Sequence, residues 1–128
     1  MIKGNVTFGE GCIVHPGAQI IAEGGDIIFG DFNIVEEYAK IVNVPRKDQQ
    51  GNAVKRTMRI GNYNQFEVNC SVESSEIGDM NEFGVRSVIG VGCVITNCCV
   101  INPTVQVPPK MKLAPNSVFI EIGVVALD

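Results

Sequence analysis

Apolar residues return at nearly every sixth position along most of this chain. The run from Ile60 to Phe119 holds eleven such positions, and only the step from Val72 to Ile77 is five residues long. A period of six fits neither the 3.6-residue turn of an α-helix nor the alternation of a single strand. It is typical of a hexapeptide repeat, in which each unit makes one short strand and one turn. Three units close a triangular coil, and the coils stack into a parallel β-helix.

The same period starts at Ile2 and is interrupted twice. Glu23–Asp26 adds three residues at one corner, and residues 43–59 carry no period at all. Eighteen apolar anchors, three to a coil, predict an all-β fold of six triangular coils. Together they form one β-helix domain over residues 1–128, with a long external loop at 43–59. The anchors expected in the core are Ile2, Phe8, Val14, Ile20, Phe29, Val35, Ile41, Ile60, Phe66, Val72, Ile77, Phe83, Ile89, Ile95, Ile101, Val107, Leu113 and Phe119.

Small or polar residues occupy the position four after many anchors. This position also faces inward, at a corner where space is tight, and we expect its side chains to be buried. Asn33, Asn64 and Asn81 fall on the same corner of the second, third and fourth coils, which predicts a ladder of stacked amides. The inner-corner residues singled out are Cys12, Asn33, Asn64, Cys70, Asn81, Cys93 and Cys99.

The cysteines and histidine give little sign of metal or disulfide chemistry. Five cysteines without a secretory leader favour free thiols, and four of them fall on inner corners. Cys98 is expected to point outward. There is no Cys-x-x-Cys pair and only one histidine, so we expect no metal site and no cofactor. No apolar run approaches the roughly 20 residues of a membrane span, and a cytoplasmic location is the default expectation.

Charge is distributed unevenly along the chain. The external loop holds five basic residues against Asp48, a net of +4, which leaves −8 for the rest of a chain whose net charge is −4. Such a loop is either a solvated insertion or a grip for an acidic partner, while the acidic balance argues against nucleic acid. Glu36 and Glu37 form either a solvated face or a second partner contact. The partner-binding candidates are Glu36, Glu37, Arg46, Lys47, Lys55, Arg56 and Arg59.

Catalysis of the types common on this fold needs histidine. A three-histidine metal centre like that of the γ-class carbonic anhydrases is excluded, because the chain has only His15. An acyltransferase needs a single base, which His15 could supply. His15 lies just before Pro16-Gly17, however, where a surface turn residue is the simpler interpretation. We therefore expect no catalytic residue, with a homotrimeric hexapeptide acyltransferase as the alternative.

Several segments resemble a known family. They include Ile20-Ile21-Ala22-Glu23-Gly24-Gly25, Ile34-Val35-Glu36-Glu37 and Ile60-Gly61-Asn62-Tyr63-Asn64. Together with the position of the long loop, they are similar to the dynactin subunit 6 family, hexapeptide-repeat proteins of the dynactin pointed-end complex. Dynactin is the cofactor of the dynein motor. The resemblance covers nearly the whole chain.

The resemblance implies a left-handed β-helix without enzymatic activity. It implies heteromeric assembly with the other pointed-end subunits, namely subunit 5, subunit 4 and the actin-related protein at the filament end. It also implies a cytoskeleton-associated location and a role in cargo or adaptor attachment during microtubule-based transport. Members of the family usually carry a further unit before the first coil and a helix and tail after the last one, so this chain resembles a part of them.

Overall fold

Three parallel sheets form the walls of the molecule. The computed structural model describes residues 1–120, which form strands and no helix. Sheet A consists of β1 (Ile2–Lys3), β4 (Gln19–Ala22), β7 (Lys40–Asn43), β12 (Ser71–Val72), β15 (Val88–Ile89) and β18 (Gln106–Val107). Sheet B consists of β2 (Val6–Thr7), β5 (Ile27–Phe29), β10 (Met58–Ile60), β13 (Glu76–Ile77), β16 (Val94–Ile95) and β19 (Lys112–Leu113). Sheet C consists of β3 (Ile13–Val14), β6 (Ile34–Val35), β11 (Gln65–Phe66), β14 (Glu82–Phe83), β17 (Val100–Ile101) and β20 (Val118–Phe119).

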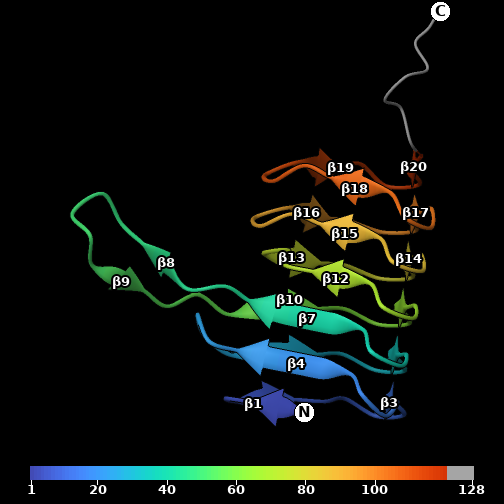
Figure 1. The fold of residues 1–128 in the computed structure, drawn as a ribbon, viewed down its shortest axis with the longest axis horizontal. Coiled ribbons are helices and arrows are strands. Elements are labelled where there is room, and N and C mark those ends of the chain that lie inside the picture. Colours follow the sequence, from blue (N-terminus) through green and yellow to red (C-terminus); the bar gives the residue numbers. More distant parts are fainter. Residues whose placement is uncertain (121–128) are drawn as a thin grey trace, which may run out of the picture.

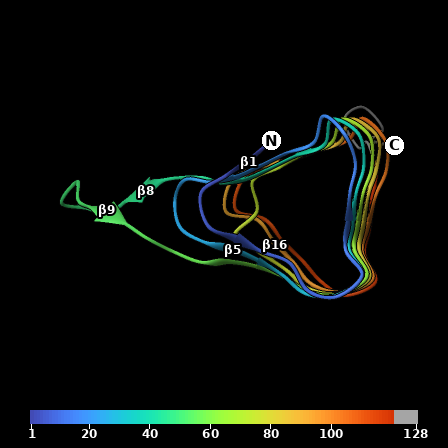
Figure 2. The same ribbon diagram turned by 90° about the horizontal axis from the view of Figure 1, so that it is seen from below.

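The chain visits the sheets in the order A, B, C and then climbs one level. Each sheet has six strands, so the described residues form the six coils that the repeat predicts (Figure 1). Viewed from the N-terminal end in Figure 2, the chain runs anticlockwise around a triangle as it recedes from the viewer. The winding is therefore left-handed. The predicted fold, a left-handed parallel β-helix with one long external loop, is confirmed.

The six-residue period places each anchor directly above an anchor of the coil below. In the strand register Ile20 pairs with Ile41, and Phe66 pairs with Phe83. The Phe66 and Phe83 rings stack with centroids 4.8 Å apart. This alignment builds continuous apolar columns inside the triangle. The anchors that it buries are Ile20, Phe29, Val35, Ile41, Ile60, Phe66, Val72, Ile77, Phe83, Ile89, Ile95, Ile101, Val107 and Leu113.

The anchors at the two ends of the described stack are less buried than expected. Ile2 and Val14 were predicted to be core residues, but their exposed fractions are 51% and 38%. Phe8 and Phe119 are only partly buried and pack against the edge of the core. The physical reason is that an anchor is covered from both sides only when a coil lies above and below it. In the first and last described coils, the described residues supply a neighbouring coil on one side only.

The predicted amide ladder is confirmed. The Asn64 side-chain amide donates to Asn33 Oδ1 at 3.0 Å, and the Asn81 amide donates to Asn64 Oδ1 at 3.0 Å. All three side chains are buried at the corner between sheets B and C. Each of the three side-chain amides donates to a backbone carbonyl, that of Asn64 to Gly78 O at 2.8 Å. The ladder therefore satisfies buried polar groups along three successive coils.

Candidate functional site

All three departures from the six-residue period lie at one corner, which we call the hairpin corner. It joins sheet A to sheet B, and there the second coil carries Glu23–Asp26 and the third carries the long loop. In the fourth coil the same corner is one residue short, between Val72 and Ile77. Figure 1 shows the loop projecting from the stack at this corner. Among the three corners, the hairpin corner thus departs most from the regular hexapeptide repeat.

The loop is a β-hairpin rather than an irregular insertion. Strands β8 (Arg46–Lys47) and β9 (Ala53–Val54) pair antiparallel. At the tip, the Asp48 carboxylate accepts hydrogen bonds from the backbone amides of Gln50 and Asn52, each at 2.9 Å. The loop is also shorter than the sequence suggested. Because β7 runs to Asn43 and β10 begins at Met58, the basic hairpin, as we call it, comprises residues 44–57.

A buried amide fixes the base of the basic hairpin. The Asn43 side chain, 3% exposed, donates to the carbonyl oxygens of Arg56 at 2.7 Å and Asp26 at 3.1 Å. In addition, the Gly24 amide donates to Asn43 O at 2.7 Å, and the Arg56 amide donates to Gly24 O at 3.1 Å. Both sides of the hairpin are therefore bonded to the second coil.

The two glycines of the short insertion make room for this contact. A Cβ atom on Gly24 would lie 2.3 Å from the carbonyl oxygen of Val44. On Gly25, whose φ is +147°, it would lie 2.3 Å from the carbonyl oxygen of Arg56. The hairpin base thus packs against the insertion at Glu23–Asp26. The two interruptions of the six-residue period, separate in the sequence, are in contact in the fold.

The cations of this region form no ion pair with any of residues 1–120. Among residues 1–120 the only ion pair joins Lys3 and Glu23, at 3.5 Å. Hence no carboxylate of the described chain lies within 4 Å of the cationic atoms of the five basic candidates. They are Arg46, Lys47, Lys55, Arg56 and Arg59. Arg46 also has a buried Nε without a hydrogen-bond partner.

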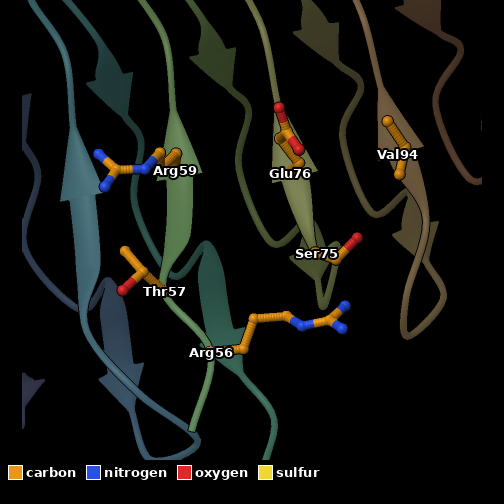
Figure 3. Close-up of a pocket in the computed structure, with 6 residues that line it drawn as sticks. All are labelled: Arg56, Thr57, Arg59, Ser75, Glu76 and Val94. Carbon is orange, nitrogen blue, oxygen red and sulfur yellow. The ribbon is translucent and has the colours of Figure 1, made fainter.

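A shallow pocket of about 350 Å³ lies beside the hairpin on sheet B. It is lined by Arg56, Thr57, Arg59, Ser75, Glu76 and Val94. In Figure 3 the Arg56 side chain extends toward Ser75, whereas Arg59 points in the opposite direction. The two guanidinium groups therefore do not converge on one point. The pocket is open to solvent and contains no enclosed catalytic arrangement.

The acidic candidates lie on another side of the triangle. Glu36 follows β6 in sheet C, and its carboxylate accepts a hydrogen bond from Gln65 Nε2 at 2.6 Å. Glu37 is exposed. Burial, a hydrogen bond to Glu82 and the charges of Glu82 and Glu36 raise the pKa of Glu67. The structure therefore separates an acidic face on sheet C from the basic hairpin, and the two sets of candidates do not meet within the chain.

His15 takes part in a surface turn. Its backbone amide donates to Val35 O at 2.8 Å and its carbonyl accepts from Ala18 N at 3.3 Å. Its imidazole forms no hydrogen bond with any described residue. No acidic group within residues 1–120 is thus placed to orient it as a general base.

The cysteines are free thiols with different surroundings. Cys70, Cys93 and Cys99 are buried, Cys12 is partly buried, and Cys98 is exposed. Burial raises the pKa of the Cys70 thiol to about 12. No group of three metal-ligating side chains occurs among residues 1–120.

Sequence reasoning missed a row of large side chains at the corner between sheets B and C. Phe32, Tyr63 and Met80 occupy equivalent turn positions in the second, third and fourth coils and are exposed. The rings of Phe32 and Tyr63 stack with centroids 5.2 Å apart. The available signal was their place in Gly-Asp-Phe-Asn, Gly-Asn-Tyr-Asn and Gly-Asp-Met-Asn. We call these three residues the apolar ridge.

The fold and its repeat define a protein of the hexapeptide-repeat β-helix class, which carries a charged hairpin at one corner. Within that class the chain is similar to dynactin subunit 6. It is 45% identical to the protein of that name from Xenopus tropicalis over 82 residues, which are 62% of this chain and 41% of the relative. For Nematostella vectensis the identity is 43% over 89 residues, 67% of this chain and 48% of the relative.

A third relative, dynactin subunit 6 of Danio rerio, is 42% identical over 86 residues, covering 62% of this chain and 43% of its own length. These comparisons confirm the resemblance to the dynactin subunit 6 family. The chain spans less than half the length of these curated relatives. No family model matches it. Nothing helical in residues 1–120 has the length and hydrophobicity to cross a bilayer.

Proposed function

We propose that this chain is a non-enzymatic structural subunit of the dynactin pointed-end complex. The observation that carries the proposal is the similarity to dynactin subunit 6. In this role it assembles with subunit 5, subunit 4 and the actin-related protein at the filament end, and it supports dynein-based transport by holding cargo or adaptors. It works in the cytoplasm on the cytoskeleton, as the single β-helix domain that the repeat predicts over residues 1–128, of which residues 121–128 lie outside the described part of the chain.

The chemistry of the surface supports a binding role. The basic hairpin is anchored by Asn43 and presents cations that have no partners in the described chain. A rigid, charged projection of this kind attracts an acidic surface and orients it, and both effects weaken as salt is added. We propose that the hairpin contacts an acidic neighbouring subunit. Glu36 and Glu37 form a separate contact on sheet C.

Reconstitution with purified pointed-end subunits tests the proposal. The variant Lys55→Glu/Arg56→Glu should weaken assembly about tenfold, because it replaces attraction with repulsion at the contact. The control Lys110→Glu/Lys112→Glu changes net charge by the same amount in the last described coil and should leave assembly intact. A second variant, Glu36→Lys/Glu37→Lys, tests the acidic contact. Undiminished assembly of both test variants at physiological salt would remove these two surfaces from the proposal.

The acyltransferase alternative makes opposite predictions. It requires a homotrimer and loss of acetyl transfer in His15→Ala. The proposed role requires a chain that forms no homotrimer alone, and a His15→Ala variant that still assembles with the pointed-end subunits. Sedimentation of the purified chain, together with an acetyl coenzyme A assay, separates the two. A homotrimer with histidine-dependent activity contradicts the proposed function.

A further inference from the structure

The apolar ridge holds large side chains in a backbone conformation that disfavours them. Phe32, Tyr63 and Met80 have φ values of 56°, 59° and 57°, in the left-handed region. Their exposed fractions are 42%, 60% and 56%. A bulky side chain costs roughly 1–2 kcal/mol in this conformation, which Gly and Asn adopt more easily. Phe32 is partly covered, because its ring stacks on Tyr63 and lies over Gly11, but Tyr63 and Met80 leave more than half of their surface in solvent.

The turn itself does not require them. At the equivalent corner, the first coil has Gly11 at φ 71° and the last described coil has Asn116 at φ 65°. These are the residue types that the conformation favours. The fifth coil, which directly follows the ridge, has the small residue Cys98 at φ 57°, so three of the six described coils close this corner without a large side chain. Large side chains also adopt this conformation at other corners, as Tyr38 and Arg86 do, but among residues 1–120 only this corner carries them in three successive coils.

The ridge is held rigidly. Outside it, the Asp31 amide donates to Asn62 Oδ1 and the Asn62 amide donates to Asp79 Oδ1, both at 2.7 Å. Inside it runs the buried ladder of Asn33, Asn64 and Asn81. Each ridge residue thus sits between two hydrogen-bonded rows. A preorganised apolar surface loses little entropy when it binds.

The surroundings of the ridge define its partner. Ile13 and Ile34 pair in neighbouring strands of sheet C directly after this corner, and Ile13 is exposed while Ile34 is partly exposed. The six turns of this corner, together with the first sheet C residue after each, contain four acidic residues and no Lys or Arg. Those acidic residues are Glu10, Asp31, Asp79 and Glu82. Two copies of the chain facing each other here would repel, whereas a partner with basic residues would be attracted.

We propose that the apolar ridge is a docking surface for an apolar groove bordered by Lys or Arg side chains on another subunit. This inference rests on the proposed function, because the partner is a subunit of the pointed-end assembly. The ridge fills the groove, and the acidic rim pairs with the basic border. The few large side chains at its centre supply most of the affinity, as is usual in protein interfaces.

The test compares two double variants of the full chain, binding to purified pointed-end subunits. Tyr63→Asn/Met80→Asn removes the exposed part of the ridge while supplying a residue that favours left-handed φ. The control Tyr38→Asn/Arg86→Asn makes the same kind of change at the corner between sheets C and A, where φ is 61° and 60°. Both variants should keep or raise the melting temperature. The ridge variant should bind at least about tenfold more weakly, while the control should bind as the wild type does.

The outcomes separate the two proposals. If the wild-type chain does not bind the pointed-end subunits, both the proposed function and this inference fail. If the wild type binds and the ridge variant binds equally well, only the inference fails. A control variant that loses as much affinity as the ridge variant also overturns it, as does a ridge-dependent homodimer in sedimentation. Weaker binding and a flatter salt dependence in Glu10→Gln/Glu82→Gln would support the basic border.

Discussion

In the buried amide ladder, a single side chain satisfies several buried polar groups and so contributes strongly to the free energy of unfolding. Asn64 donates to Asn33 Oδ1 and Gly78 O, and it accepts from Asn81. Replacing it with Ala would leave several buried polar groups unpaired at once, each of which costs about 1–3 kcal/mol. We expect Asn64→Ala to lower the free energy of unfolding by about 3 kcal/mol or more in urea denaturation.

A matched control lies on the outer row of the same corner. Asn97 is exposed, and its side chain accepts one hydrogen bond, from the Asp79 amide at 2.7 Å. Asn97→Ala should cost about 1 kcal/mol, because water can replace the lost acceptor. Equal losses in the two variants would mean that the ladder contributes no more than a surface hydrogen bond.

Glu67 gives a pH-dependent prediction at the same scale. Its pKa is raised by burial, then by the hydrogen bond to Glu82 and the charges of Glu82 and Glu36. The folded chain therefore binds this proton more tightly than the unfolded chain does, and stability falls as pH rises from the usual carboxyl range toward neutrality. Glu67→Gln should raise the melting temperature at pH 7. The gain should disappear below the usual glutamate pKa of 4.5. A gain that persists in acid would assign the effect to packing instead.

At the scale of elements, the hairpin is bonded to a neighbouring coil through Asn43. Because its amide bonds the carbonyl oxygens of both Asp26 and Arg56, Asn43→Ala should release the hairpin base while the coils stay folded. We expect faster trypsin cleavage at Lys47 and Lys55, with an unchanged circular dichroism spectrum. The control Asp48→Ala removes only the hydrogen bonds at the tip. If cleavage increases equally in both variants, the amide does not hold the base.

The structural features that could be predicted from the sequence are those that repeat in every coil. The six-residue period fixed the strands, the number of coils and even the partners of Asn64, because every coil imposes the same spacing. It could not place the hairpin base, which depends on a contact between Gly24 and Val44 in different coils. It also missed Met58, a buried residue of β10 that lies outside the period of the anchors. The apolar ridge was missed for another reason. Tyr63 lies at a turn position, outside the period of the anchors, and only the shared Gly-x-x-Asn context connects it with the other two ridge residues.

At the scale of the whole molecule, stability should decline from the middle of the stack toward its ends. Each coil contacts only its neighbours, so a central coil is supported on both sides and an end coil on one. Phe66 is fully buried and stacks on Phe83. Phe66→Ala should therefore cost about 3–5 kcal/mol. Val14 lies in the first coil with 38% of its surface exposed, and Val14→Ala should cost less than about 1 kcal/mol.

Hydrogen exchange on the native chain can resolve the same gradient without substitutions. The backbone amides of β11 and β14 should exchange most slowly, and those of β1, β2 and β3 should exchange fastest, since local opening requires the fewest broken contacts at an end. Val14→Ala should speed exchange only in the first coil. Phe66→Ala should speed hydrogen exchange in every coil. The substitution interrupts the core at the third coil, so the coils on either side no longer share one continuous core. Uniform protection across the six coils would show instead that the β-helix opens only as a single cooperative unit.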